Sequence, residues 1–75
     1  MPPRSPRHLH LGEAVKAIRE DRGLTQTQVG KRMEVPATFV SDIERGIRNP
    51  SLSTLLTLSE ALKIKLSEIT ARAGL

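Results

Sequence analysis

The chain contains no cysteine, no tryptophan and no tyrosine, and Phe39 is its one large aromatic residue. Without cysteine there is no disulfide framework and no sign of an oxidising compartment. A single aromatic side chain argues against recognition of single strands by base stacking, which needs several flat side chains on one surface. No apolar run approaches the roughly 20 residues that span a bilayer, and the opening MPPRSPRHLH lacks the apolar core of a signal peptide. We therefore expect a cytoplasmic protein with no membrane partner.

Positive charge is in excess. The 12 lysines and arginines outnumber the eight acidic residues, which gives a formal net charge of +4. This balance favours a polyanionic partner, and the lack of aromatic residues makes duplex DNA the better candidate. The 75 residues make one domain that buries only about 60% of its unfolded surface, so association with a second copy would add stability.

Apolar spacing predicts five helices around one core and no strand. Residues 1–7 contain three prolines and two arginines, and we expect them to form a flexible arm before a single domain over residues 8–75. Helices are expected at about residues 8–22, 26–33, 37–45, 52–62 and 66–72. The predicted fold class is all-α, a compact five-helix bundle.

Helical stripes are predicted for the outer helices. The first helix ends at Gly23, and its stripe is Leu11, Val15, Ile18 and Arg22, with Ala14 beside it. Ser51 can cap the fourth helix, whose expected stripe is Leu52, Leu55, Leu56, Ser59 and Leu62. In the last helix, Leu66 and Ile69 are expected to point inward.

The segment from Leu24 to Pro50 is predicted to be two short helices joined by a tight turn, followed by a basic loop. Thr25 and Gln28 have the spacing of a capping box, which satisfies free amides at a helix start. Gly30 lets the second helix approach closely. Inward side chains at the expected spacing are Val29, Met33, Val35, Val40 and Ile43.

These residues, in register, resemble the helix-turn-helix family of Xre-like regulators, which includes Cro and C1-type phage repressors, restriction-modification controller proteins and antitoxins. The resemblance runs from about Leu11 to Ile69 and implies a bundle of the lambda-repressor type that binds double-stranded DNA. The motifs that carry it are Leu11-Gly12, Ile18-Arg19, Gly23-Leu24-Thr25-Gln26, Val29-Gly30, Ile43-Glu44-Arg45-Gly46, Asn49-Pro50-Ser51-Leu52 and Leu55.

Three positions depart from the family pattern. Glu34 stands where relatives usually place glycine in the turn, and a left-handed backbone there costs about 1 kcal/mol. Pro36 replaces the common Ser or Thr cap of the second motif helix, and Lys63 replaces the glycine that commonly follows the fourth helix.

The helix after the turn enters the major groove in this motif. With Val40 and Ile43 anchored inside, the candidate base readers are Ala37, Thr38, Ser41 and Asp42. The hydroxyls can bond base edges, Ala37 can touch a thymine methyl and Asp42 can accept from a cytosine amino group. The alternative interpretation is a solvated helix face.

Other residues are candidates for the DNA backbone. The resemblance implies that Gln26 holds a phosphate at a helix start. Phe39 lies where relatives often carry Tyr or Thr toward the backbone; it would pack on a sugar or thymine methyl, or turn into the protein. The basic and polar candidates are Arg22, Lys31, Arg32, Arg45, Arg48 and Asn49.

The resemblance also implies an ion pair between Arg19 and Glu44 with a structural role. The arm, with Arg4 and Arg7, would be a tail without a role or a minor-groove contact. His8 and His10 lack helical ligand spacing and a third ligand, so we expect no metal and no cofactor.

The predicted function is a sequence-specific, double-stranded DNA-binding regulator of transcription, acting as a homodimer on a pseudo-palindromic operator. The expected dimer contact is C-terminal, with Leu66, Ile69 and Leu75. The alternative is a protein-interaction module for a toxin or RNA polymerase. An enzyme is not expected, because no nucleophile motif, phosphate loop or sheltered pocket is indicated.

Overall fold

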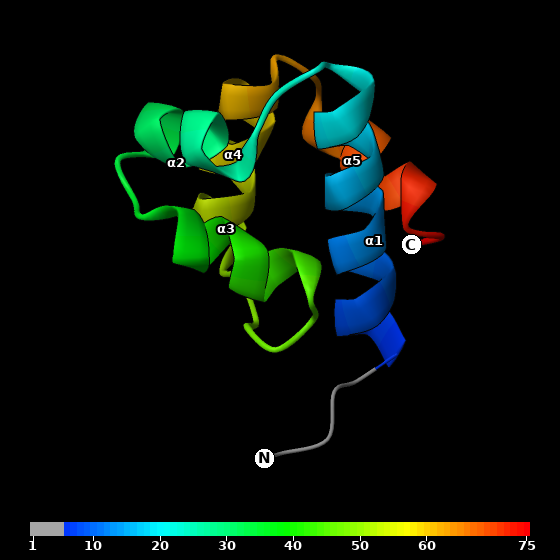
Figure 1. Cartoon of the computed structure of the whole chain (residues 1–75). Helices are drawn as coiled ribbons and strands as arrows, with labels where there is room; N and C mark the ends of the chain where they lie inside the picture. Colours follow the sequence, from blue (N-terminus) through cyan, green and yellow to red (C-terminus); the bar gives the residue numbers. More distant parts are fainter. Residues whose placement is uncertain (1–5) are drawn as a thin grey trace.

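The computed structural model describes the backbone of residues 6–75 and the side chains of residues 10–75. In this range the chain forms five helices and no strand: α1 (Pro6–Asp21), α2 (Gln26–Met33), α3 (Ala37–Glu44), α4 (Leu52–Leu62) and α5 (Leu66–Arg72). The helices α2, α3 and α4 lie to one side of α1, and α5 packs against α1 and α4 (Figure 1). The predicted five-helix, all-α fold is confirmed.

Helix α1 begins at Pro6, about two residues earlier than expected. Proline suits the first position of a helix, because its missing N–H would have no partner there and its φ is already helical. Residues 6 and 7 therefore belong to the helix and not to the predicted arm. The expectation for residues 1–5, with Arg4, lies outside the described residues, as do the side chains of Arg7 and His8.

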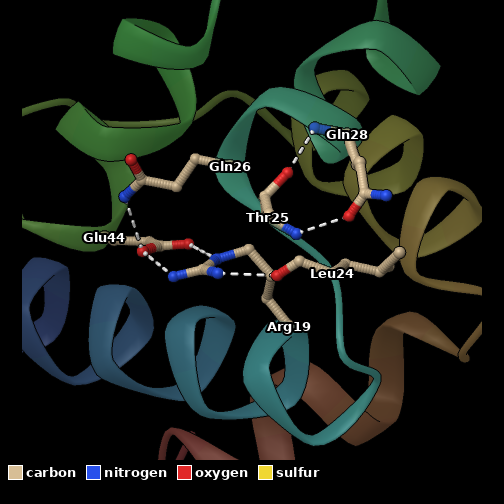
Figure 2. A network of polar contacts seen from close by, with 6 residues as sticks. All are labelled: Arg19, Leu24, Thr25, Gln26, Gln28 and Glu44. Carbon is tan, nitrogen blue, oxygen red and sulfur yellow. Dashed lines mark hydrogen bonds and ion pairs between the residues drawn. The ribbon is translucent and has the colours of Figure 1, made fainter.

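The start of α2 has the predicted capping box (Figure 2). The Thr25 hydroxyl accepts a hydrogen bond from the Gln28 amide at 3.0 Å, and the Gln28 side-chain oxygen accepts from the Thr25 amide at 2.8 Å. Two otherwise free amides are thereby satisfied, and a cap of this kind stabilises a helix by about 1 kcal/mol.

The turn between α2 and α3 brings the two helices close together. A Cβ atom on Gly30 would lie 2.6 Å from the Val35 carbonyl oxygen and 3.4 Å from the Ala37 amide nitrogen, which confirms the predicted close approach. Glu34 has φ 61° and ψ 41°, so a non-glycine residue occupies the left-handed region at the end of α2. Pro36 then precedes α3 without a side-chain cap, as expected.

Helix α4 begins where predicted, with the Ser51 hydroxyl accepting from the Thr54 amide at 3.1 Å. The expected inward stripe is partly wrong: Leu52 and Leu56 are 66% and 45% exposed, whereas Leu58 is fully buried. With five leucines distributed around an eleven-residue helix, a spacing of three and four does not determine which of them face inward.

The core lies between all five helices. Each helix contributes at least one side chain that is almost completely buried: Val15, Val29, Val40, Ile43, Leu58, Leu62 and Ile69.

Lys63 ends α4 with φ 57°, so this second non-glycine residue also takes the left-handed turn that glycine usually makes. Among residues 6–75, no helix has the length and apolar character needed to cross a membrane.

Candidate nucleic-acid interface

Helix α3 has one buried and one open side. Val40 and Ile43 are 0% and 1% exposed and fix the helix against the core. On the other side Thr38 is exposed, and the further predicted readers Ala37, Ser41 and Asp42 are half-buried. This short helix therefore presents two hydroxyls and one carboxylate on a side that the core leaves accessible.

The end of α3 lies directly against the backbone of α1. A Cβ atom on Gly12 would come 2.5 Å from the Ile43 carbonyl oxygen and would also collide with that of Glu44. Sequence reasoning included Gly12 in the family motif but did not assign it this contact. A glycine next to Leu11 on a helical apolar stripe was the available signal, since glycine lowers helix stability and is kept where backbones approach.

A buried ion pair joins the same two helices (Figure 2). Arg19 donates from Nε to Glu44 Oε2 at 2.6 Å and from Nη2 to Oε1 at 3.1 Å, and the two residues are 9% and 7% exposed. The hydrogen bond to Glu44 raises the pKa of Arg19 above its usual value, against the opposing effect of burial. The two-pronged geometry of this pair restricts rotation of α3 against α1.

Two further hydrogen bonds extend this network to α2. Arg19 Nη1 donates to the Leu24 carbonyl oxygen at 2.7 Å, and Gln26 Nε2 donates to Glu44 Oε1 at 3.0 Å (Figure 2). One amide hydrogen of Gln26 is thus used inside the protein, while its second amide hydrogen and its carbonyl oxygen have no role in this bond. The phosphate contact predicted for Gln26 stays a prediction.

Phe39 turns toward the protein, which was one of its two predicted orientations. Its half-buried ring packs against the core, and the guanidinium carbon of Arg48 lies 4.3 Å from the ring centroid. Arg48 Nη2 also approaches Asp42 Oδ2 at 3.7 Å. The loop after α3 therefore places an arginine beside a predicted base reader, a contact that sequence reasoning missed because spacing does not specify the path of a loop.

Among the predicted backbone contacts, Arg32 has a partner within the chain. Its Nη1 donates to the Ala61 carbonyl oxygen at 2.7 Å, which ties α2 to the last turn of α4, where carbonyl groups lack helical partners. This contact gives Arg32 a structural role that was not predicted. The other cationic and polar candidates are exposed: Arg22, Lys31, Arg45, Arg48 and Asn49.

The predicted dimer contact needs a correction. Ile69 is fully buried in the core of its own chain and has no surface to offer a second copy. Its spacing matched an inward position equally well, and burial inside the chain is what the structure shows. Leu66 is half-buried and Leu75 is 61% exposed.

An open hollow of about 500 Å³ lies between α1 and the C-terminal end of α5, lined by His10, Glu13, Ala14, Ala17, Arg72, Ala73 and Gly74. Within residues 10–75 no group of three His, Asp or Glu side chains is arranged to hold a metal ion, and His10 is exposed. A small cavity of about 130 Å³ beside Phe39 lies between α2, α3 and the first turns of α4. Its size fits a single side chain better than a metabolite, which usually needs at least about 300 Å³.

Comparison with known protein families agrees with this arrangement of helices. A family model described as HTH_3, helix-turn-helix, matches residues 15–69, a range that contains the whole of α2, α3 and α4. The chain belongs to the helix-turn-helix family. The resemblance inferred from the sequence motifs is therefore confirmed at the level of the family.

Relatives of this helix-turn-helix chain come from phage and bacteria. It is 42% identical over 65 residues to the immunity repressor protein of Bacillus phage phi105, covering 87% of this chain and 45% of the repressor. It is 34% identical over 65 residues to the control protein C.SmaI of Serratia marcescens, covering 87% of this chain and 77% of that protein. The chain thus spans less than half the length of the phage repressor.

A solved structure gives the same fold. The restriction-modification controller protein C.AhdI from Aeromonas hydrophila superposes with a TM-score of 0.80 at 31% identity, over 83% of this chain and 94% of the controller. The five helices therefore have the arrangement of an all-helical transcriptional regulator, and the family is one of regulators and not of enzymes.

Proposed function

We propose that the chain binds double-stranded DNA in a sequence-specific manner and regulates transcription as a homodimer on a pseudo-palindromic operator. The observation that carries the proposal is the anchoring of α3. Two buried side chains, the close contact at Gly12 and the Arg19–Glu44 pair hold this helix from the core side. Rigid support of this kind is what a helix needs to read base edges with a reproducible geometry.

The open side of α3 supplies the reading chemistry. Thr38 and Ser41 can donate or accept hydrogen bonds at base edges, and the methyl group of Ala37 can contact a thymine methyl. Asp42 can accept from a cytosine amino group. The exposed cations and Gln26 would contact phosphates, which supply affinity but carry no sequence information.

The dimer is proposed from symmetry and from exposed apolar surface. A two-fold axis would place the two α3 helices about 34 Å apart, one turn of the duplex, so each would read one of two half-sites of equivalent sequence. Leu75 remains a candidate for the contact together with the half-buried Leu66. Two further candidates for the dimer contact are the exposed Leu52 and Leu56, which lie one turn apart on α4.

The same exposed leucines support a second candidate function. An apolar pair on α4 could contact a toxin or an RNA polymerase subunit, with DNA binding incidental. The two functions differ in whether a defined duplex is bound in the presence of excess nonspecific DNA.

Selection of duplexes from a random pool tests the first proposal. We expect enrichment of a consensus with two-fold symmetry and half-sites about one helical turn apart. Recovery of a random population, with tight binding to a protein partner instead, would favour the interaction module. An asymmetric single site would contradict the dimer and leave DNA binding in place.

A further inference from the structure

The contact among Phe39, Asp42 and Arg48 brings opposite charges together on the reading side of α3. Arg48 Nη2 lies 3.7 Å from Asp42 Oδ2, and the two side chains are 45% and 31% exposed. The distance is longer than a hydrogen bond, so the donors of Arg48 and the oxygens of Asp42 keep capacity for other partners. Both groups remain open to a ligand.

Phe39 determines where this arginine lies. Its ring is held on the core side by packing, and the Arg48 guanidinium carbon is 4.3 Å from the ring centroid. A cation at this distance is attracted to the electron-rich face of the ring, and guanidinium groups stack well on flat aromatic surfaces. Arg48 is thereby kept beside α3, although it belongs to the loop that follows the helix.

The pair matches the edge of one base pair. In the major groove a G·C pair presents two acceptors on guanine, N7 and O6, next to one donor, the N4 amino group of cytosine. An arginine next to a carboxylate offers the complementary order, two donors and then an acceptor. An A·T pair presents an acceptor, a donor and an acceptor, so one donor of Arg48 would face the adenine amino group and the Asp42 carboxylate would face thymine O4.

Charge compensation supports the same assignment. Asp42 alone would bring a negative charge into a groove lined by phosphates, which is unfavourable. With Arg48 beside it, the two side chains have no net charge. A carboxylate on a reading helix is then compatible with DNA.

We propose that Arg48 and Asp42 together read one G·C base pair in each half-site, with Arg48 donating to guanine N7 and O6 and Asp42 accepting from the cytosine amino group. This inference rests on the proposed DNA-binding function. It moves Arg48 from the predicted phosphate contacts to the specificity-determining residues, and it makes Phe39 a positioning residue for Arg48.

The test is duplex selection with wild-type protein and the variants Arg48→Ala and Asp42→Ala. The wild-type consensus should contain one G·C position that both variants relax. Preference for that base pair should fall about five- to a hundred-fold with Arg48→Ala, the range expected for a lost bidentate contact. Other positions of the consensus should keep their preferences.

Arg22→Ala provides the matched control, because Arg22 is an exposed arginine directly after α1 and outside the contact with Phe39. It should lower affinity for all duplexes alike. If Arg48→Ala behaves as Arg22→Ala does, with an unchanged consensus, Arg48 contacts phosphate and the inference is overturned, while the proposed function stands. If the wild-type protein enriches no duplex, the proposed sequence-specific DNA binding is itself contradicted.

The positioning role of Phe39 is tested with Phe39→Tyr and Phe39→Leu. The tyrosine variant keeps the ring under Arg48 and should retain the preference for G·C. The leucine variant should lose part of it, at temperatures well below its measured unfolding midpoint. Full retention of the preference by a folded leucine variant would show that the ring does not position Arg48.

Discussion

At the scale of single residues, the Glu44 carboxylate connects α3 to both α1 and α2. It accepts two hydrogen bonds from Arg19 and one from Gln26, and its side chain is 3% exposed. A buried carboxylate that accepts three hydrogen bonds has a structural role. Its charge compensates an arginine that could not otherwise be buried.

Glu44→Ala should therefore reduce the free energy of unfolding by roughly 2 kcal/mol or more, because it leaves the Arg19 charge buried without a partner. For a domain of this size the midpoint of thermal unfolding should fall by roughly 8–16 °C. Calorimetry or circular dichroism measures the change. Glu60→Ala, at an exposed position of α4, is the control and should shift stability by less than about 0.5 kcal/mol. An equal midpoint for Glu44→Ala and wild type would refute the structural role.

At the scale of elements, the turn before α3 has a conformation that its residue does not favour. Glu34 has φ 61°, and the residue has a Cβ atom that makes this region costly. Glycine adopts it without the steric penalty.

Glu34→Gly should therefore stabilise the protein by up to about 1 kcal/mol, even though glycine gains more freedom in the unfolded chain. Glu34→Ala separates the effect of charge on stability from the effect of backbone conformation, since it removes the carboxylate and keeps the Cβ atom. We expect a higher midpoint in urea unfolding for the glycine variant alone. A rise of the same size in both variants would assign the effect to charge.

Helix ends were predictable from the sequence where local chemistry determines them. The capping box of Thr25 and Gln28 places the start of α2, and the Ser51 cap places the start of α4. Such signals act within one turn of chain, so no tertiary information is needed. The predicted start of α1 was wrong because Pro6 was treated as a breaker, although proline is tolerated at a helix start.

The packing between helices and the path of the loops were less predictable from the sequence. The inward leucines of α4 depend on how the helix is rotated against α2 and α5, and the buried residues that show this rotation are Leu58, Ser59, Ala61 and Leu62. Ile69 and Leu75 both looked like apolar candidates for a partner, and packing separates them. The readers of α3 followed from its anchored residues, whereas the contact of Arg48 with Phe39 depends on the folded path of a loop.

At the scale of the whole molecule, the net charge of +4 gives a prediction for DNA binding. If a dimer neutralises about six phosphates, log K should fall with log salt concentration at a slope of about −5. Titrations of a selected duplex at several salt concentrations measure the slope. A slope near zero would mean that the exposed cations do not meet phosphates.

The central claim is that the open side of α3 reads base sequence while the rest of the molecule supplies rigidity and charge. The most direct measurement is the ratio of affinities for a selected duplex and a scrambled duplex, at one salt concentration, for wild type and for the double variant Thr38→Ala with Ser41→Ala. Both substitutions leave the core untouched and keep good helix formers on α3. We predict that the ratio falls at least about tenfold while affinity for the scrambled duplex is retained. An unchanged ratio in a folded double variant would contradict the claim.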